Sequence, residues 1–115
     1  MSRADAQMSA LDGTWTLYSV DGKPVSADDR VPFFSLHGTS FNGFDGCNRF
    51  GGDLRQPHST VVGQRACAGT VVRIPLDPIR LSDHLDNAEL EGNRLRLTPR
   101  EGYPASEFRR GKSRP

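Results

Sequence analysis

The sequence has no long apolar run, few cysteines and almost no net charge, and each of these absences narrows the function. No segment approaches the roughly 18 consecutive apolar residues that a transmembrane helix needs. The 2 cysteines are too few for a disulfide-dense scaffold, although they permit one bridge in an oxidising compartment. The net charge is +1, so no global electric field attracts the whole chain to nucleic acid or to a membrane.

The residues that are abundant are those of strands and turns. Only 35% of the chain is hydrophobic, whereas it contains 12 glycines and 8 prolines. This composition favours a β-rich domain over a helical bundle. At 115 residues the chain corresponds to one domain that can bury one hydrophobic core.

Alternation of apolar and polar residues predicts most of the strands. Residues 13–20 form one strand, in which Trp15 and Leu17 share a face. Turn signals predict two hairpins, one around Gly38 and one around the pair Gly92–Asn93. The other expected elements are a strand within 47–55 with a turn or bulge at Gly51–Gly52, a loop at 56–60, two β-rich runs between 60 and 74 that are broken at Ala68–Gly69, and a last strand at 106–110.

One short helix is predicted near residues 77–87. Asp77 is a suitable N-cap, and Pro78 fits the first helical position because its missing N–H would have no partner there. Many antiparallel strands with one late helix predict an α+β fold. We expect a mostly antiparallel curved sheet or partial β-barrel that is closed by this short helix.

The stretch DGCNRFGG, residues 45–52, carries the most specific pattern. Together with the LDGTW segment, the RAC tripeptide and the LEGNRLRL hairpin, it resembles the META domain family, to which the heat-shock protein HslJ belongs. The resemblance covers residues 11–110, which leaves 1–10 as a flexible lead-in and 111–115 as a basic disordered tail. The structural signature positions are Trp15, Gly46, Cys47, Asn48, Arg49, Phe50 and Cys67.

The resemblance implies a compact β-rich domain, and proteins that are often exported or anchored as lipoproteins. The family is linked to stress response and antibiotic tolerance in bacteria and to virulence in some parasites, and no catalytic activity defines it. The first residues contain no apolar h-region of a secretory signal. We therefore expect a cytoplasmic protein as the sequence stands, or a periplasmic or envelope protein if an export signal was removed.

Cys47 and Cys67 leave two alternatives open. They form a disulfide if their Cα atoms lie about 4.4–6.8 Å apart, a distance that neighbouring strands supply, or they remain two buried free thiols. A catalytic Cys47 needs a lowered pKa and a base, and none of the 3 histidines has a spacing that marks it as a partner. Zinc needs paired ligands at short spacing, which neither cysteine has. We therefore expect no catalytic residue, no metal site and no cofactor.

The neighbours of Cys47 are interpreted as structural. Asn48 can bond its own backbone and shape the turn, while Arg49 can pair with Asp45 or Asp53 or cover apolar surface with its stem. The functional alternative for Arg49 is a ligand-facing side chain that clamps an anion, and nothing in the sequence favours it. Aromatic residues on the strands are interpreted as core, the alternative being the lining of an apolar pocket inside a partial barrel. These are Trp15, Phe33, Phe34, Phe41, Phe44 and Phe50.

The expected function is non-enzymatic, namely stress- or envelope-related binding of a protein or an apolar small molecule by a monomer. The alternative is a protein-interaction or inhibitor module of a surface or secretion complex. An enzyme that uses Cys47 is the third hypothesis. The last 22 residues hold an excess of basic side chains, which either bind a polyanion or form a solvated end. We expect no nucleic-acid partner.

Overall fold

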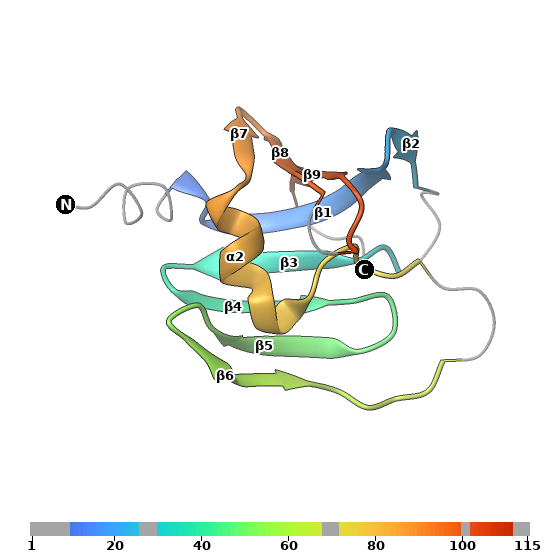
Figure 1. Cartoon of the computed structure of the whole chain (residues 1–115). Helices are drawn as coiled ribbons and strands as arrows, with labels where there is room; N and C mark the ends of the chain where they lie inside the picture. The colour runs from blue at the N-terminus through green and yellow to red at the C-terminus, as the bar shows by residue number, and fades with distance from the viewer. Residues whose placement is uncertain (1–9, 26–29, 68–71, 100–101, 112–115) are drawn as a thin grey trace.

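The computed structural model describes residues 10–25, 30–67, 72–99 and 102–111, which form a 9-stranded antiparallel sheet (Figure 1). The spatial order is β6-β5-β4-β3-β1-β9-β8-β7, and the short β2 pairs with β1. The strands are β1 (Gly13–Val20), β2 (Lys23–Pro24), β3 (Phe33–His37), β4 (Ser40–Phe44), β5 (Arg49–Asp53), β6 (Gln56–Val62), β7 (Glu89–Glu91), β8 (Arg94–Leu97) and β9 (Ser106–Arg110). Both predicted hairpins, β3–β4 and β7–β8, are confirmed.

One helical segment crosses the open side of this sheet. It begins as a 3₁₀ turn, η1 (Pro78–Arg80), and continues as α2 (Leu81–Asp86). The Asp77 carboxylate accepts a hydrogen bond of 3.1 Å from the Ile79 N–H, so the predicted N-cap is confirmed. The segment starts beside β6 and leads into β7, the two edge strands (Figure 1). The described sheet is therefore open rather than a closed barrel, and one short helix covers it.

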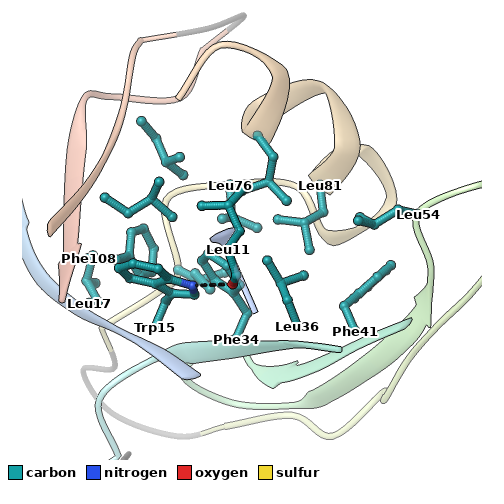
Figure 2. Close-up of a cluster of buried hydrophobic side chains, with 14 of the residues drawn as sticks. Leu11, Trp15, Leu17, Phe34, Leu36, Phe41, Leu54, Leu76, Leu81 and Phe108 are labelled. Atoms are coloured by element: carbon teal, nitrogen blue, oxygen red, sulfur yellow. Dashed lines mark hydrogen bonds between the residues drawn. The ribbon is translucent and has the colours of Figure 1, made fainter. Parts of the chain in front are cut away.

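The core fills the space between the sheet and the helix (Figure 2). Trp15 is fully buried, and its indole N–H donates to the Leu11 carbonyl at 2.8 Å, which ties the start of β1 to the core. The rings of Phe34 and Phe108 pack edge to face with centroids 5.0 Å apart. Phe50, on β5, is also buried in this core. The inner face of the sheet is thus occupied by its own side chains.

Two of the aromatic residues that were predicted to be core lie elsewhere. Phe33 and Phe44 are cross-strand partners on the outer face, with ring centroids 6.4 Å apart, and both are only half-buried. The reason is the two-residue period of a strand, because a buried Phe34 turns its neighbour Phe33 outward. The prediction of a core position is wrong for this pair.

The sequence prediction is also wrong between β5 and the helix. Residues 56–60 are the first part of β6 and not a loop. β6 is an edge strand, which tolerates Pro57 and polar side chains because one of its edges has no partner strand. The second β-rich run is not a strand over residues 72–74, and residues 68–71 lie outside the described part of the chain. The bulge is confirmed, since the β5–β6 register shifts between Gly51 and Asp53.

Residues 1–9 and 112–115 lie outside the described residues, so the predicted lead-in and tail stay predictions. In the part that the structure describes, no helix has the length and apolar character that crossing a membrane requires.

Candidate binding surface at the signature turn

The turn between β4 and β5 is closed by Asp45. One carboxylate oxygen of Asp45 accepts hydrogen bonds from the N–H groups of Cys47, at 2.8 Å, and Asn48, at 2.6 Å. The Asp45 N–H in turn donates to the Asn48 carbonyl at 2.9 Å. Asp45 therefore plays the part that the sequence analysis gave to Asn48, and an aspartate two residues before the bonded N–H is a recognisable signal for such a turn.

Asn48 instead binds a distant segment of backbone. Its side-chain oxygen accepts from the Arg65 N–H at 2.6 Å, and its side-chain nitrogen donates to the Arg65 carbonyl at 3.1 Å. The side-chain amide thus bonds both the N–H and the C=O of one residue, as the backbone of a neighbouring strand would. Asn48 is thus structural, as predicted, but it joins two segments instead of bonding its own turn.

A disulfide joins the same two segments. Cys47 and Cys67 have Cα atoms 5.9 Å apart and are separated by 20 residues along the chain. Of the two alternatives that the sequence left open, the structure contains the bridge. Because the chain has 2 cysteines and both are bonded, neither sulfur is a free thiol.

Gly46 allows a third segment to approach the turn. Its φ of 107° is a left-handed conformation that side chains rarely adopt, and a Cβ there would collide with the carbonyl oxygen of Val72. The Ile74 N–H donates to the Asp45 carbonyl at 2.8 Å just beyond this contact. The signature turn is thus the point at which residues 45–48, 63–67 and 72–74 are fastened together.

Arg49 does not have the partners that were predicted for it. The Asp45 carboxylate is occupied by the two backbone N–H groups. The Asp53 carboxylate accepts from the Arg55 N–H at 2.8 Å and lies 3.6 Å from the Arg55 guanidinium. These contacts of Arg55 hold the pKa of Asp53 below its usual value. Arg49 is exposed at the start of β5, directly across from Phe44.

Four exposed arginines surround this turn, and we call them the arginine cluster. The Arg30 guanidinium lies 5.2 Å from the centre of the Phe44 ring. The others come from the segments that the turn fastens together, at the end of the sheet drawn on the right in Figure 1. The members of the cluster are Arg30, Arg49, Arg65 and Arg73.

The family of this chain follows from its match to a family model. The META domain model matches residues 7–112. The chain belongs to the META domain family. No curated protein and no solved structure matches it. In this META domain the signature stretch 45–52 is the place where segments distant in sequence are joined, and the disulfide is one of the links.

The arginines on the outer face of β8 and β9 of this META domain are paired with acids. Glu107 accepts from Arg109 at 2.8 Å and lies 3.4 Å from Arg94. Arg96 lies 3.5 Å from Glu91 and 4.0 Å from Glu107. The bond from Arg109, followed by that from Arg94, lowers the pKa of Glu107 against the opposing effect of burial. These three arginines therefore share ion pairs with two glutamates, whereas the arginine cluster has no ion pair with a described residue.

A pocket of about 260 Å³ lies where β1, β8 and β9 end. Its walls include Leu97 and Pro99, with Arg96 and Glu107 also on the lining. The Ser106 hydroxyl, on a residue only 6% exposed, has no hydrogen-bond partner within the described residues. This pocket was not predicted, because its walls come from strand ends that are far apart in sequence.

The described residues of this META domain contain no group of three or more His, Cys, Asp or Glu side chains that could hold a metal ion. The absence of a metal site and of a catalytic residue stays a prediction. The sequence analysis considered Arg49 alone as an anion-binding residue and missed the arginine cluster as a group. No spacing signals it, since its members belong to four separate segments.

Proposed function

We propose that this META domain is a non-enzymatic binding domain of an oxidising compartment, such as a bacterial periplasm or envelope, with a role in stress tolerance. It binds its partner on its outer surface at the signature turn. The single observation that carries this proposal is the disulfide between Cys47 and Cys67, which uses both cysteine sulfurs of the chain. A bridged sulfur is not a thiolate, so it cannot be the attacking group of a cysteine enzyme.

Two further features support the proposal. Structural disulfides persist in oxidising compartments and are rare in reducing ones. The inner face of the sheet is packed by side chains such as Trp15, Phe34 and Phe108, each fully buried, which leaves surface binding as the simpler mode.

Thiol trapping in the native host tests the compartment. Cells are quenched in acid, and the denatured protein is treated with a maleimide–polyethylene glycol reagent before and after reduction. We expect no mass addition before reduction and two additions after it. Two additions before reduction would place the protein in a reducing compartment and overturn that part of the proposal.

A genetic test separates binding from catalysis. A host without the gene is complemented with the wild-type chain or with the Cys47→Ala/Cys67→Ala double variant, and survival of heat stress is measured at a temperature at which the variant is folded. We expect the folded variant to restore most of the survival, because the Asn48 side chain still bonds the Arg65 backbone without the bridge. A folded variant that fails completely would support a nucleophilic Cys47 instead.

A second candidate function is binding of a small apolar ligand in the pocket at the ends of β1, β8 and β9. The observation that favours it is the Ser106 hydroxyl, on a lining residue of the pocket, which has no hydrogen-bond partner among the described residues and which would bond a polar group on a ligand after rotating toward the pocket. Native mass spectrometry of protein purified from its own host tests this candidate. We expect an added mass that is lost in Ser106→Val, and an unliganded mass for both proteins would rule it out.

A further inference from the structure

The arginine cluster is a positive surface whose members have no acidic partner among the described residues. Arg30, Arg49, Arg65 and Arg73 are all exposed, and none of their guanidinium groups has an ion pair with a described residue. The carboxylate within the turn, that of Asp45, is turned onto backbone N–H groups. A guanidinium keeps its charge at every physiological pH, so this end of the sheet carries permanent positive charge although the whole chain is at only +1.

The backbone beneath the cluster is held in place before any partner arrives. The disulfide fixes residues 47 and 67, and the Asn48 side chain clamps the backbone of Arg65 on both sides. A Cβ at Gly46 would lie only 3.3 Å from the Arg73 Cα, which shows how closely that segment packs on the turn. A surface that is already ordered loses little backbone entropy when it binds.

The chemistry of the cluster selects oxyanions. Planar guanidinium groups match phosphate and carboxylate geometry, often with two parallel hydrogen bonds. Nucleic acid bases would need exposed aromatic faces to stack on, but the Phe44 ring is half-buried and already stacks with Arg30. The phosphates of a surface are therefore a better match than a stacked single strand.

Two exposed aliphatic side chains accompany the charges. Val72 is 37% exposed and precedes Arg73, and Val61 is 70% exposed on the last part of β6. Val61 pairs with Gly51, two residues from Arg49 on β5. Basic side chains next to exposed aliphatic ones are typical of proteins that lie on an anionic lipid surface.

We propose that the arginine cluster, with Val72 and Val61, docks this META domain onto an anionic phospholipid membrane. The guanidinium groups bind the headgroup phosphates, and the valines contact the interface. This inference rests on the proposed function in one respect: it names the partner of the surface at the signature turn. The attraction is local and acts within about one Debye length, roughly 10 Å at 0.1 M salt, so it does not need a large net charge.

Vesicle co-sedimentation of the oxidised full chain tests the inference. The probes are vesicles of phosphatidylcholine with 30% phosphatidylglycerol, and vesicles of phosphatidylcholine alone. Arg65 and Arg73 are the residues to change. Arg30 is left in place because Asp28 and Asp29 come just before it in the sequence and lie outside the described residues. Each basic residue near such a surface contributes about a fivefold change in partitioning. We therefore expect Arg65→Ala/Arg73→Ala to weaken binding to the anionic vesicles by about 25-fold.

The matched control removes the same charge from paired arginines. Arg94→Ala/Arg96→Ala lowers the net charge equally but acts on groups that already form ion pairs with Glu91 and Glu107. We expect it to leave binding within about twofold of wild type, and Arg65→Lys/Arg73→Lys to retain most of the binding. Circular dichroism checks that each variant is folded.

Three outcomes would overturn the inference. They are equal sedimentation with both kinds of vesicle, an equal loss in the two alanine double variants, and tight binding of single-stranded DNA or polyglutamate without vesicle binding. The last outcome would assign the cluster to a different polyanion. Failure of this inference and failure of the proposed function can be told apart. Reduced cysteines in the host would disprove the proposed oxidising compartment, but they would not change vesicle binding by the purified oxidised chain.

Discussion

Reducing the Cys47–Cys67 disulfide is the most direct perturbation of this domain. The bridge closes a stretch with a separation of 20 residues. In the chain-entropy treatment, a loop of this length restricts the unfolded chain enough to contribute about 3 kcal/mol to the free energy of unfolding at 25 °C. The two hydrogen bonds between the Asn48 side chain and the Arg65 backbone do not involve the sulfurs, so we expect them to hold the two segments together after reduction. We therefore expect the reduced protein to fold, but with lower stability.

The expected change in melting temperature follows from domain size. For a domain of about 100 residues, 1 kcal/mol shifts Tm by roughly 4 °C. Full reduction is thus expected to lower Tm by about 10–15 °C. Thermal unfolding followed by circular dichroism, with and without a phosphine reductant, measures the difference.

The control is the Cys47→Ala/Cys67→Ala double variant. It should melt close to the reduced wild type, within the roughly 1 kcal/mol that truncation of the buried Cys47 side chain adds, and its Tm should not respond to reductant. Alkylation of both thiols after reduction verifies that the bridge was broken. An unchanged Tm in a fully alkylated sample would refute the reasoning.

Three other variants test separate contacts. Gly46→Ala should lower the free energy of unfolding by about 1–3 kcal/mol through backbone strain, and by more through the collision of the new Cβ with the Val72 carbonyl. Gly92→Ala, also at positive φ but with open space around it, should cost only about 1 kcal/mol in urea unfolding, and equal losses would disprove the close approach. Asp77→Ala should cost about 1 kcal/mol by loss of the N-cap, and an unchanged urea midpoint would contradict that assignment. Glu107→Gln should destabilise at pH 7 and much less at pH 3. The folded pKa is lowered, chiefly by Arg109, so the carboxylate stabilises above its ordinary value of 4.5, and this contribution is lost as pH falls through the folded pKa. A gap between wild type and variant that stays constant with pH would show that the ion pairs do not stabilise the fold.

Local patterns were sufficient to predict most of the elements. The alternation in residues 13–20 put Trp15 and Leu17 on one face, and the structure buries both, because a strand directs alternate side chains to opposite faces. The Asp–Pro pair at 77–78 predicted the start of the helix, because the cap is formed by residues that are neighbours in sequence. Where the pattern failed, at Phe33 and in β6, burial depended on which strand faces the core and which one lies at the edge.

The sequence by itself determined the β-rich class, the hairpins, the helix start and the family signature, since each depends on residues within a few positions of one another. Only the tertiary structure decided that Cys47 meets Cys67, that Asn48 holds Arg65, and that four arginines gather around one turn. These contacts join segments separated by about 14 to 27 residues. No local propensity encodes them, because they form only when the strands pair in register and bring one end of β3, β4 and β5 together.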